Sequence, residues 1–268
     1  MNVVPLAEAH DVVAFGGKAV QLAAALRAGL PVPPGAAVPS ALVDAVAAGE
    51  AAGTAALEAV AALVAGPVAV RSSAIGEDSA EASFAGQHLT QLNVRDARRL
   101  AEAVVAVWAS ARSEAALAYR ARLGIDGSPR TGVVVQRLLD PDVAGVLFTR
   151  DPLDGSDKRV VEASWGLGEA VVAGRVIPDR FRIARDGTIL ERTAGWKHVA
   201  LRPSALGGTV EEPVAAGLVE QLCLDDRRLG ELNGLATRCE RAFGAGRDLE
   251  WAFAGGTVYL LQCRAVTR

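Results

Sequence analysis

Three polar side chains interrupt two otherwise apolar stretches near the end of the chain: Glu250 in DLEWAF, and Gln262 and Arg264 in TVYLLQCR. The Gly255-Gly256 pair between the stretches predicts a hairpin. With a two-residue turn, Glu250 would point away from Gln262. A three-residue loop, or a bulge at the glycines, would instead bring the three polar side chains to one face.

A carboxylate and an amide oxygen on one face are ligands that Mg²⁺ prefers. An arginine beside them suits a phosphate group that the metal bridges. Glu250, Gln262 and Arg264 are therefore candidates for a metal and phosphate site. The alternative is that they form the polar outer face of an edge hairpin.

Two cations in the first third of the chain are candidates for binding phosphate. Lys18 follows a Gly-Gly pair at the start of a predicted helix, where backbone N–H groups favour an anion. Ala19 follows the lysine, so this is not a GxxxxGK[ST] loop, and an ordinary helix start is the alternative. Arg71 ends the apolar stretch VAVR and suits bidentate phosphate binding at the edge of a cleft. Its alternative is a surface arginine paired with Glu77 or Asp78.

Gln136 and Glu162 are polar residues in stretches that otherwise predict buried strands. Gln136, in VVVQR, lies where the backbone of a hinge between two lobes would contact an adenine; the alternative is a hydrogen-bonded core amide. Glu162, in VVEASW, precedes a Gly-rich turn and suits accepting hydrogen bonds from a ribose or an amino group. A strand-end carboxylate in solvent is the alternative, and the local sequence does not choose.

The elements that must position these side chains fall into two halves. Helical spacing and alternating or short apolar runs give the individual predictions. The predicted helices cover 16–29, 41–65, 96–123 and about 213–243, and the predicted strands 68–71, 88–94, 133–139, 143–150, 159–165, 180–185, 188–190, 248–253 and 257–264. We therefore expect an α+β protein whose single domain, 1–268, has lobe one at about 1–135, lobe two at about 136–268, and a cleft between them.

The composition excludes several classes of protein. Over 268 residues the net charge is −3, so no overall positive field favours nucleic acid or an acidic membrane surface. No CxxC, HExxH or GxSxG pattern occurs, which argues against a zinc site and a covalent hydrolase. The first ten residues lack a signal-peptide pattern and no apolar stretch reaches the length of a membrane span. We expect a cytoplasmic chain with no nucleic-acid or membrane partner.

The lysines are unusually few. The chain has 25 arginines and only three lysines, which are Lys18, Lys158 and Lys197. A lysine that remains in such a composition is a mild indication that a compact ammonium group is needed there, rather than a planar guanidinium. Chance is the preferred explanation for Lys158, which lies in a polar loop.

Taken together, these segments resemble the ATP-grasp nucleotide-binding domain of the phosphoenolpyruvate synthase and pyruvate phosphate dikinase family, which rifampicin phosphotransferases and glucan water dikinases also carry. The composite motifs are RSSAIGEDS followed by SFAGQ, and DLEWAF followed by LLQCR. The matching segments follow the family order over nearly the whole chain: 16–35, 68–94, 133–152, 160–181 and 248–267. The chain departs from the pattern at Ala265, where the family typically has proline, and at Cys263, which replaces a small hydroxyl residue.

The resemblance implies three catalytic cations. Lys18 and Arg71 are similar to the family's phosphate-contacting residues, and Arg264 is similar to the arginine that contacts the transferring phosphates. The expected ligands are ATP and Mg²⁺.

The resemblance also implies the remaining contacts. Gln136 would lie at the hinge against adenine, and Glu162 would contact the nucleoside. Glu250 and Gln262 would bind Mg²⁺, which requires the odd-length loop or the bulge between them.

The reaction that the resemblance implies is of dikinase type: ATP passes its β-phosphoryl group to a histidine and its γ-phosphate to water or phosphate, leaving AMP. The family carries that histidine on a swivelling domain, and no Thr-His-x-Gly segment occurs in this sequence. The leading hypothesis therefore places it on a separate phosphohistidine-domain protein, which serves a small-molecule acceptor that the sequence does not identify. A second hypothesis is a self-sufficient ATP-grasp kinase or ligase that releases ADP. A third is a non-catalytic nucleotide-binding module.

Overall fold

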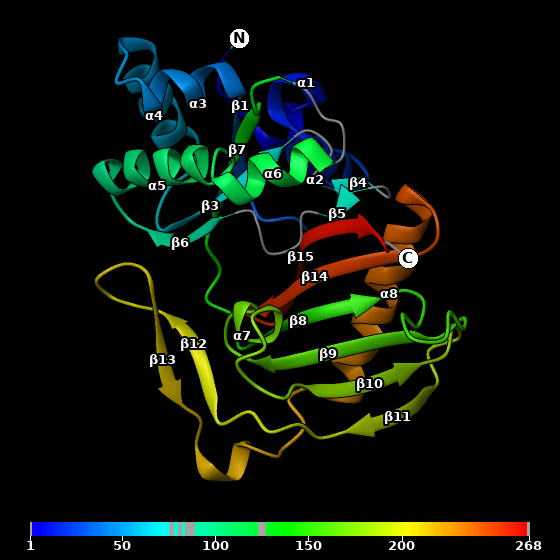
Figure 1. Ribbon diagram of the computed structural model, residues 1–268. Helices are drawn as coiled ribbons and strands as arrows, with labels where there is room; N and C mark the ends of the chain where they lie inside the picture. Colours follow the sequence, from blue (N-terminus) through cyan, green and yellow to red (C-terminus); the bar gives the residue numbers. More distant parts are fainter. Residues whose placement is uncertain (1, 75–77, 80–81, 84–88, 123–126, 267–268) are drawn as a thin grey trace.

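Two lobes, each built on an antiparallel sheet, make up this protein (Figure 1). The computed structural model describes residues 2–74, 78–79, 82–83, 89–122 and 127–266. Helices and strands are mixed in both lobes, so the predicted α+β class is confirmed.

Lobe one contains a five-stranded sheet in the order β1-β2-β7-β3-β6. Its strands are β1 (Val4–Pro5), β2 (Gly35–Val38), β3 (Val68–Ala74), β6 (Thr90–Val94) and β7 (Thr131–Arg137), and β4 (Asp78–Ser79) and β5 (Ala82–Ser83) form a separate pair. Valine runs suit β3 and β7 because both faces of these strands are buried. Val133 and Val135 pack beneath α3 (Ser40–Ala47), α4 (Ala51–Leu63) and α5 (Ala97–Ser110). Val134 faces the opposite core, with α1 (Val12–Phe15) and α2 (Gly17–Arg27).

The long helix predicted over 41–65 is interrupted at Gly49. This glycine adopts φ 70°, and the chain bends by 117° between α3 and α4. The helix predicted over 96–123 is likewise divided, into α5 and α6 (Glu114–Arg122). Within the described ranges no single helix is long and apolar enough to cross a membrane; only the bent pair of α3 and α4 passes that test, by length and composition alone.

Lobe two contains a six-stranded sheet in the order β11-β10-β9-β8-β14-β15. Its strands are β8 (Val143–Phe148), β9 (Arg159–Trp165), β10 (Asp179–Ile183), β11 (Ile189–Thr193), β14 (Arg247–Ala254) and β15 (Thr257–Ala265). Helix α8 (Asp226–Phe243) covers one face and shares a core with Leu249, Trp251 and Phe253 of β14. Since side chains alternate along a strand, Asp248 and Glu250 face away from α8.

Between β11 and α8, residues 194–225 leave the six-stranded sheet, and we call this segment the excursion. It forms a hairpin of β12 (Val199–Pro203) and β13 (Thr209–Pro213), followed by the 3-10 turn η2 (Ala216–Leu218). The helix predicted from about 213 therefore begins only at Asp226. Asp225 caps it by accepting a hydrogen bond from the Arg228 amide at 2.8 Å, whereas the residues before it are used by the hairpin and the turn.

The lobes share part of one hydrophobic core. Leu22 and Ala23 of α2 belong to the same cluster as Leu260 and Cys263 of β15. The Leu260 amide also donates to the Pro31 carbonyl at 2.8 Å. The chain leaves lobe one after β7 and enters lobe two at β8, so residues 138–142 form the connection.

A fully buried ion pair fixes the start of the excursion on lobe two. The Lys197 Nζ atom lies 2.5 Å from Asp179 Oδ1 and 3.0 Å from the Val219 carbonyl, and both charged side chains are 0% exposed. Asp179 also accepts hydrogen bonds from the amides of Gly195 (2.8 Å) and Cys223 (2.7 Å). Lys197 and Lys18 are both buried, where a compact ammonium group was expected from the sequence, whereas Lys158 is exposed.

We expect Lys197→Met to lower the free energy of unfolding by about 3–5 kcal/mol, because it leaves the Asp179 carboxylate buried without its counter-charge. Urea denaturation followed by circular dichroism measures the change. Lys158→Met removes an exposed lysine and serves as the matched control, with an expected change within about 0.5 kcal/mol. Equal losses in the two variants would contradict the structural role of the pair.

Candidate nucleotide-binding cleft

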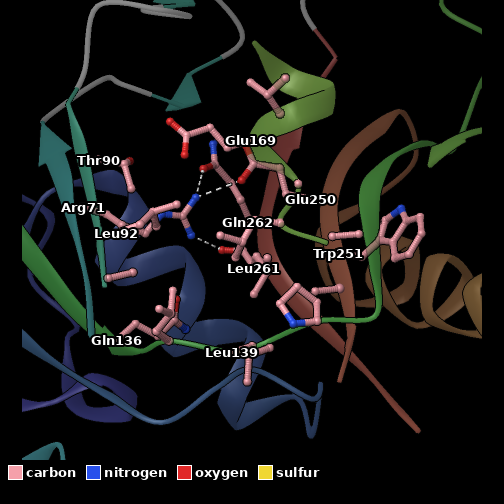
Figure 2. A pocket seen from close by; sticks show the side chains of 18 of the residues that line it. Arg71, Thr90, Leu92, Gln136, Leu139, Glu169, Glu250, Trp251, Leu261 and Gln262 are labelled. Carbon is pink, nitrogen blue, oxygen red and sulfur yellow. Dashed lines mark hydrogen bonds and ion pairs between the residues drawn. The ribbon is translucent and has the colours of Figure 1, made fainter. Parts of the chain in front are cut away.

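A cavity of about 540 Å³ lies between the lobes (Figure 2). Its volume is typical of sites for small molecules. The wall includes six of the seven candidate residues predicted from the sequence: Lys18, Arg71, Gln136, Glu250, Gln262 and Arg264. The first three come from lobe one and the last three from lobe two, so the cavity depends on both lobes.

Glu250 and Gln262 lie directly opposite each other on β14 and β15. The turn between these strands has two residues, Gly255 (φ 57°) and Gly256 (φ 76°), as in the simplest hairpin. The register shifts farther along, because Glu250 pairs with Gln262 while Trp251 pairs with Leu260, which leaves Leu261 as the extra residue. A bulge thus aligns the polar side chains, but it lies at Leu261 and not at the glycines.

Arg71 crosses from lobe one to this pair of strands. Its NH2 atom lies 2.9 Å from Glu250 Oε2 and 2.9 Å from Gln262 Oε1 (Figure 2). Its NH1 atom donates to the Leu261 carbonyl at 2.5 Å, so the bulge supplies one of the acceptors. The carboxylate partner of Arg71 is Glu250; of the two alternatives weighed from the sequence, Glu77 and the Asp78 side chain lie outside the described parts of the structure.

These contacts test whether Glu250 and Gln262 fit a divalent cation. One carboxylate oxygen and one amide oxygen converge on the same cationic nitrogen at equal distances, which is the arrangement that two ligands of one ion require. No group of three or more His, Cys, Asp or Glu side chains suited to a metal occurs among the described residues. The pair therefore fits a cation that takes its remaining ligands from phosphate and water.

Lys18 is held against β3 by the glycines that precede it. Gly16 adopts φ 80°, and a Cβ there would lie 1.8 Å from the Ser73 carbonyl oxygen, so only glycine allows this approach. The Ser73 hydroxyl accepts from the Ala19 amide at 2.9 Å, and Lys18 Nζ donates to the Ser72 carbonyl at 3.2 Å. The ammonium group, 6% exposed, thus lies beside the strand that carries Arg71.

Asp248 orients Arg264 and was missed by the sequence reasoning. The Arg264 Nε atom donates to Asp248 Oδ2 at 2.8 Å, and the two residues face each other across β14 and β15. Burial raises the pKa of the Asp248 carboxyl, Arg264 opposes this shift, and the negative charge of Glu250 adds to it. Its position two residues before Glu250, on the same face, was a signal that could have identified it.

Gln136 has the environment of a core amide and also lines the cavity. Its side chain is 2% exposed and donates from Nε2 to the Pro33 carbonyl at 3.0 Å, as a core amide would. It also lines the cavity, next to the connection between the lobes. The Gln136 side-chain amide is already bound to the Pro33 carbonyl. At this end of the cavity, the other parts of the wall are the neighbouring backbone and the apolar side chains of Leu138 and Leu139.

Glu162 does not line the cavity. It lies on β9, opposite Val146 of β8 and Arg180 of β10, whereas the strands that lobe two contributes to the cavity wall are β8, β14 and β15. The acidic residue that does line it is Glu169, at the start of the short helix α7 (Glu169–Val172). Figure 2 shows its side chain among those that line the cavity. In the sequence, only the Gly-rich turn is a recognisable signal at this place, because the direction of a loop carboxylate is not a local property.

Residues 50–268 match the family model described as the pyruvate phosphate dikinase AMP/ATP-binding domain. Over about 75% of its length the chain is 41% identical to a probable phosphoenolpyruvate synthase of Methanothermobacter thermautotrophicus, of which it covers 29%. It is 42% identical to a rifampicin phosphotransferase of a Streptomyces species and 36% identical to an uncharacterized phosphotransferase of Bacillus subtilis, covering 23% and 24% of those proteins. The chain thus spans less than a third of the curated relatives that it matches.

The raised pKa of Asp248 leads to a pH-dependent prediction. The folded state holds the proton of Asp248 more tightly than the unfolded state, so ionised Asp248 lowers the stability increasingly as the pH rises above about 4. Asparagine does not titrate. We therefore expect the free energy of unfolding of Asp248→Asn, relative to that of the unchanged chain, to rise between about pH 4 and about pH 7 in urea titrations.

Asp186→Asn is the matched control for this measurement. Hydrogen bonds from Thr188 lower the pKa of the exposed Asp186 carboxyl, so its ionised form adds stability as the pH rises toward about 4. The free energy of unfolding of Asp186→Asn, relative to that of the unchanged chain, should therefore fall as the pH rises toward about 4. This change is opposite in sign to the one expected for Asp248→Asn. The same pH slope in both variants would contradict the interpretation.

Proposed function

The chain belongs to the family of pyruvate phosphate dikinase AMP/ATP-binding domains, which have the ATP-grasp fold, and from this premise we propose that it is the ATP-handling part of a dikinase-type phosphotransferase. ATP and Mg²⁺ occupy the cleft, the β-phosphoryl group passes to a histidine of a separate domain, and AMP is left. The observation that carries the proposal is the convergence of Lys18, Arg71 and Arg264 with Glu250 and Gln262 on one cavity between the lobes.

The three cations stabilise the negative charge of the phosphates. Lys18 provides a compact ammonium, and Arg71 and Arg264 provide planar guanidinium groups suited to two phosphate oxygens each. Asp248 holds the Arg264 side chain in place through a hydrogen bond from its Nε atom. Because phosphoryl transfer needs mainly positioning and charge neutralisation, such a set of cations accounts for most of the catalysis.

Glu250 and Gln262 hold the metal in this proposal. With Mg²⁺ held there, these two residues would place a positive charge that neutralises part of the charge of the phosphates. Arg71 contacts an oxygen of each of these residues, so binding of the metal there would require Arg71 to give up these contacts, and the phosphates would then be its partners.

The nucleoside lies at the other end of the cavity. Leu92, Leu138 and Leu167 offer an apolar surface to the adenine, beside the backbone that follows Gln136. The contact with the nucleoside that the resemblance suggests for Glu162 is assigned instead to Glu169, whose carboxylate suits the ribose hydroxyl groups.

The receiving histidine lies outside the cavity wall. Of the histidines within the described residues, His10 and His198 are exposed and neither lines the cavity, while His88 lies outside those residues. We therefore propose that a separate phosphohistidine domain approaches the cleft and passes the phosphoryl group to a small-molecule acceptor. A cytoplasmic location fits this reaction, because its substrate is ATP.

³¹P NMR of the chain with ATP and Mg²⁺ tests the proposal. We expect AMP to accumulate only when a separately expressed phosphohistidine domain is added, together with a phosphohistidine resonance on that domain. Release of ADP in the presence of a small-molecule acceptor, without the added domain, would identify a self-sufficient kinase or ligase instead. Binding of ATP with no product in either mixture would identify a non-catalytic module.

Arg264→Ala adds a variant to the same assay. We expect AMP formation to fall by a factor of about 10² or more, with a small change in the dissociation constant for ATP, because the guanidinium acts on the transferring phosphates. Arg227→Ala, on the exposed surface of α8, is the matched control and should leave both quantities unchanged. Unchanged turnover in Arg264→Ala would overturn the assigned role.

The contact between Arg71 and the two proposed metal ligands gives a prediction that needs no turnover. Arg71→Met removes the guanidinium that neutralises Glu250, so we expect Mn²⁺ to bind the nucleotide-free variant about tenfold more tightly than the unchanged chain. Electron paramagnetic resonance of free Mn²⁺ measures the affinity. Arg71→Met combined with Glu250→Gln should abolish the gain, and equal affinities in Arg71→Met and the unchanged chain would contradict the assignment.

A further inference from the structure

The hairpin of β12 and β13, residues 199–213, extends from lobe two toward lobe one and has no role in the proposed chemistry (Figure 1). We call it the bridging hairpin. Its base is fixed on lobe two in several ways. Leu201 forms a parallel bridge with Gly166 and accepts from the Leu167 amide at 2.9 Å, and Arg202 donates to the Pro141 carbonyl at 2.9 Å. The buried Lys197 pair lies just before it.

The tip of the bridging hairpin is hydrogen-bonded to lobe one. The Asn93 side chain donates from Nδ2 to the carbonyls of Ser204 at 2.6 Å and Gly208 at 2.7 Å. The Gly208 amide donates to the Asn93 carbonyl at 3.2 Å, and Arg99 of α5 donates to the Leu206 carbonyl. Because three carbonyls of the tip are acceptors for side chains of lobe one, the tip is bound by a defined set of donors rather than by general surface contact.

Asn93 has a backbone conformation adapted to this contact. Its φ of 58° is the only positive φ of a non-glycine residue in the described parts of the chain, and its side chain is 1% exposed. The register of β6 against β3 is interrupted at this point, since Val68 pairs with Val94 while Val70 pairs with Gln91. Such a conformation costs free energy and persists where the surroundings hold it in place. Here the surroundings are the carbonyls of the hairpin tip.

The bridging hairpin also closes a small apolar cluster that forms part of the nucleotide cavity. Leu201 of β12 packs with Leu167, and Leu92 of β6 and Leu138 of the connection pack against them. Three of these four residues, Leu92, Leu138 and Leu167, also line the cavity. The cluster therefore joins the hairpin, both lobes and the cavity wall in one set of contacts.

We propose that the bridging hairpin is a strap that sets the separation of the two lobes, and that Asn93 is the residue that fastens it. The lobes are also joined by the shared core of α2 and β15, by the contacts of Arg71 with β14 and β15, and by residues 138–142. Widening the cleft by moving the lobes apart must therefore stretch the hairpin or release its tip from Asn93. The fastening itself does not depend on the proposed function, whereas its effect on nucleotide release rests on that function.

Hydrogen–deuterium exchange of the nucleotide-free chain tests the fastening. We expect Asn93→Gly to speed amide exchange in residues 204–210 by about tenfold or more, because glycine tolerates the backbone conformation but removes both side-chain donors. Arg99→Ala, which removes an exposed donor to the same tip, should also speed this exchange. It is the second variant of the test, in case Asn93→Gly does not fold. Leu206→Ser is the matched control, because the Leu206 side chain is 82% exposed and only its carbonyl is used.

Dissociation of a fluorescent ATP analogue, measured by stopped flow, tests the consequence. We expect release from Asn93→Gly to be several-fold faster and release from Leu206→Ser to be unchanged. Unchanged exchange of residues 204–210 in both Asn93→Gly and Arg99→Ala would overturn the fastening. Faster exchange with an unchanged release rate would overturn the control of the cleft, and absence of binding by the unchanged chain would refute the proposed function while leaving the exchange result valid.

Discussion

A single guanidinium group connects the two halves of the site. Arg71 lies at the edge of lobe one, yet its three acceptors, Glu250, Leu261 and Gln262, all belong to the terminal hairpin of lobe two. The side chain is largely buried, so its charge has to be matched within the protein, and a carboxylate with two neutral oxygens provides the match. The bulge that brings these oxygens to one face also supplies the third acceptor, the Leu261 carbonyl. The position of Arg71 thus depends on the fold of both lobes.

The same constraint explains where other buried cations lie. Lys197 and Arg159 are almost fully enclosed, and each is surrounded by acceptors: Asp179 and a carbonyl for the lysine, and Glu240, Thr237 and Asn233 for the arginine. Burial lowers the pKa of Arg159, while Glu240 opposes the shift. These cations stabilise the attachment of the excursion and of α8 to the sheet of lobe two, whereas Lys18, Arg71 and Arg264 line the cavity. Lys197 and Arg159 are thus enclosed within lobe two, whereas the other three cations face the cavity.

The connections between the lobes suit a site that has to exclude water and also exchange a large ligand. The shared core of α2 and β15 provides a continuous apolar contact, which does not separate without exposing buried surface. The bridging hairpin provides hydrogen bonds at its tip, which form and break at a smaller cost. A cleft joined in these two ways would open by releasing the tip while the shared core stays intact. Phosphoryl transfer benefits from such an enclosed cavity, because charges act more strongly where water is excluded.

Local patterns in the sequence were enough to predict the class of the fold, most of the strands and six of the residues that line the cavity. The alternation of polar and apolar residues in 248–253 and 257–264 indicated the face of each strand, and Gly255-Gly256 indicated the turn, because both are local properties. The bulge at Leu261, the part played by Asp248 and the replacement of Glu162 by Glu169 in the cavity wall were decided by tertiary structure. So were the late start of α8 and the contact of Asn93 with the hairpin tip. Each of these depends on a partner distant in the sequence, and a local pattern contains no information about which residue that partner will be.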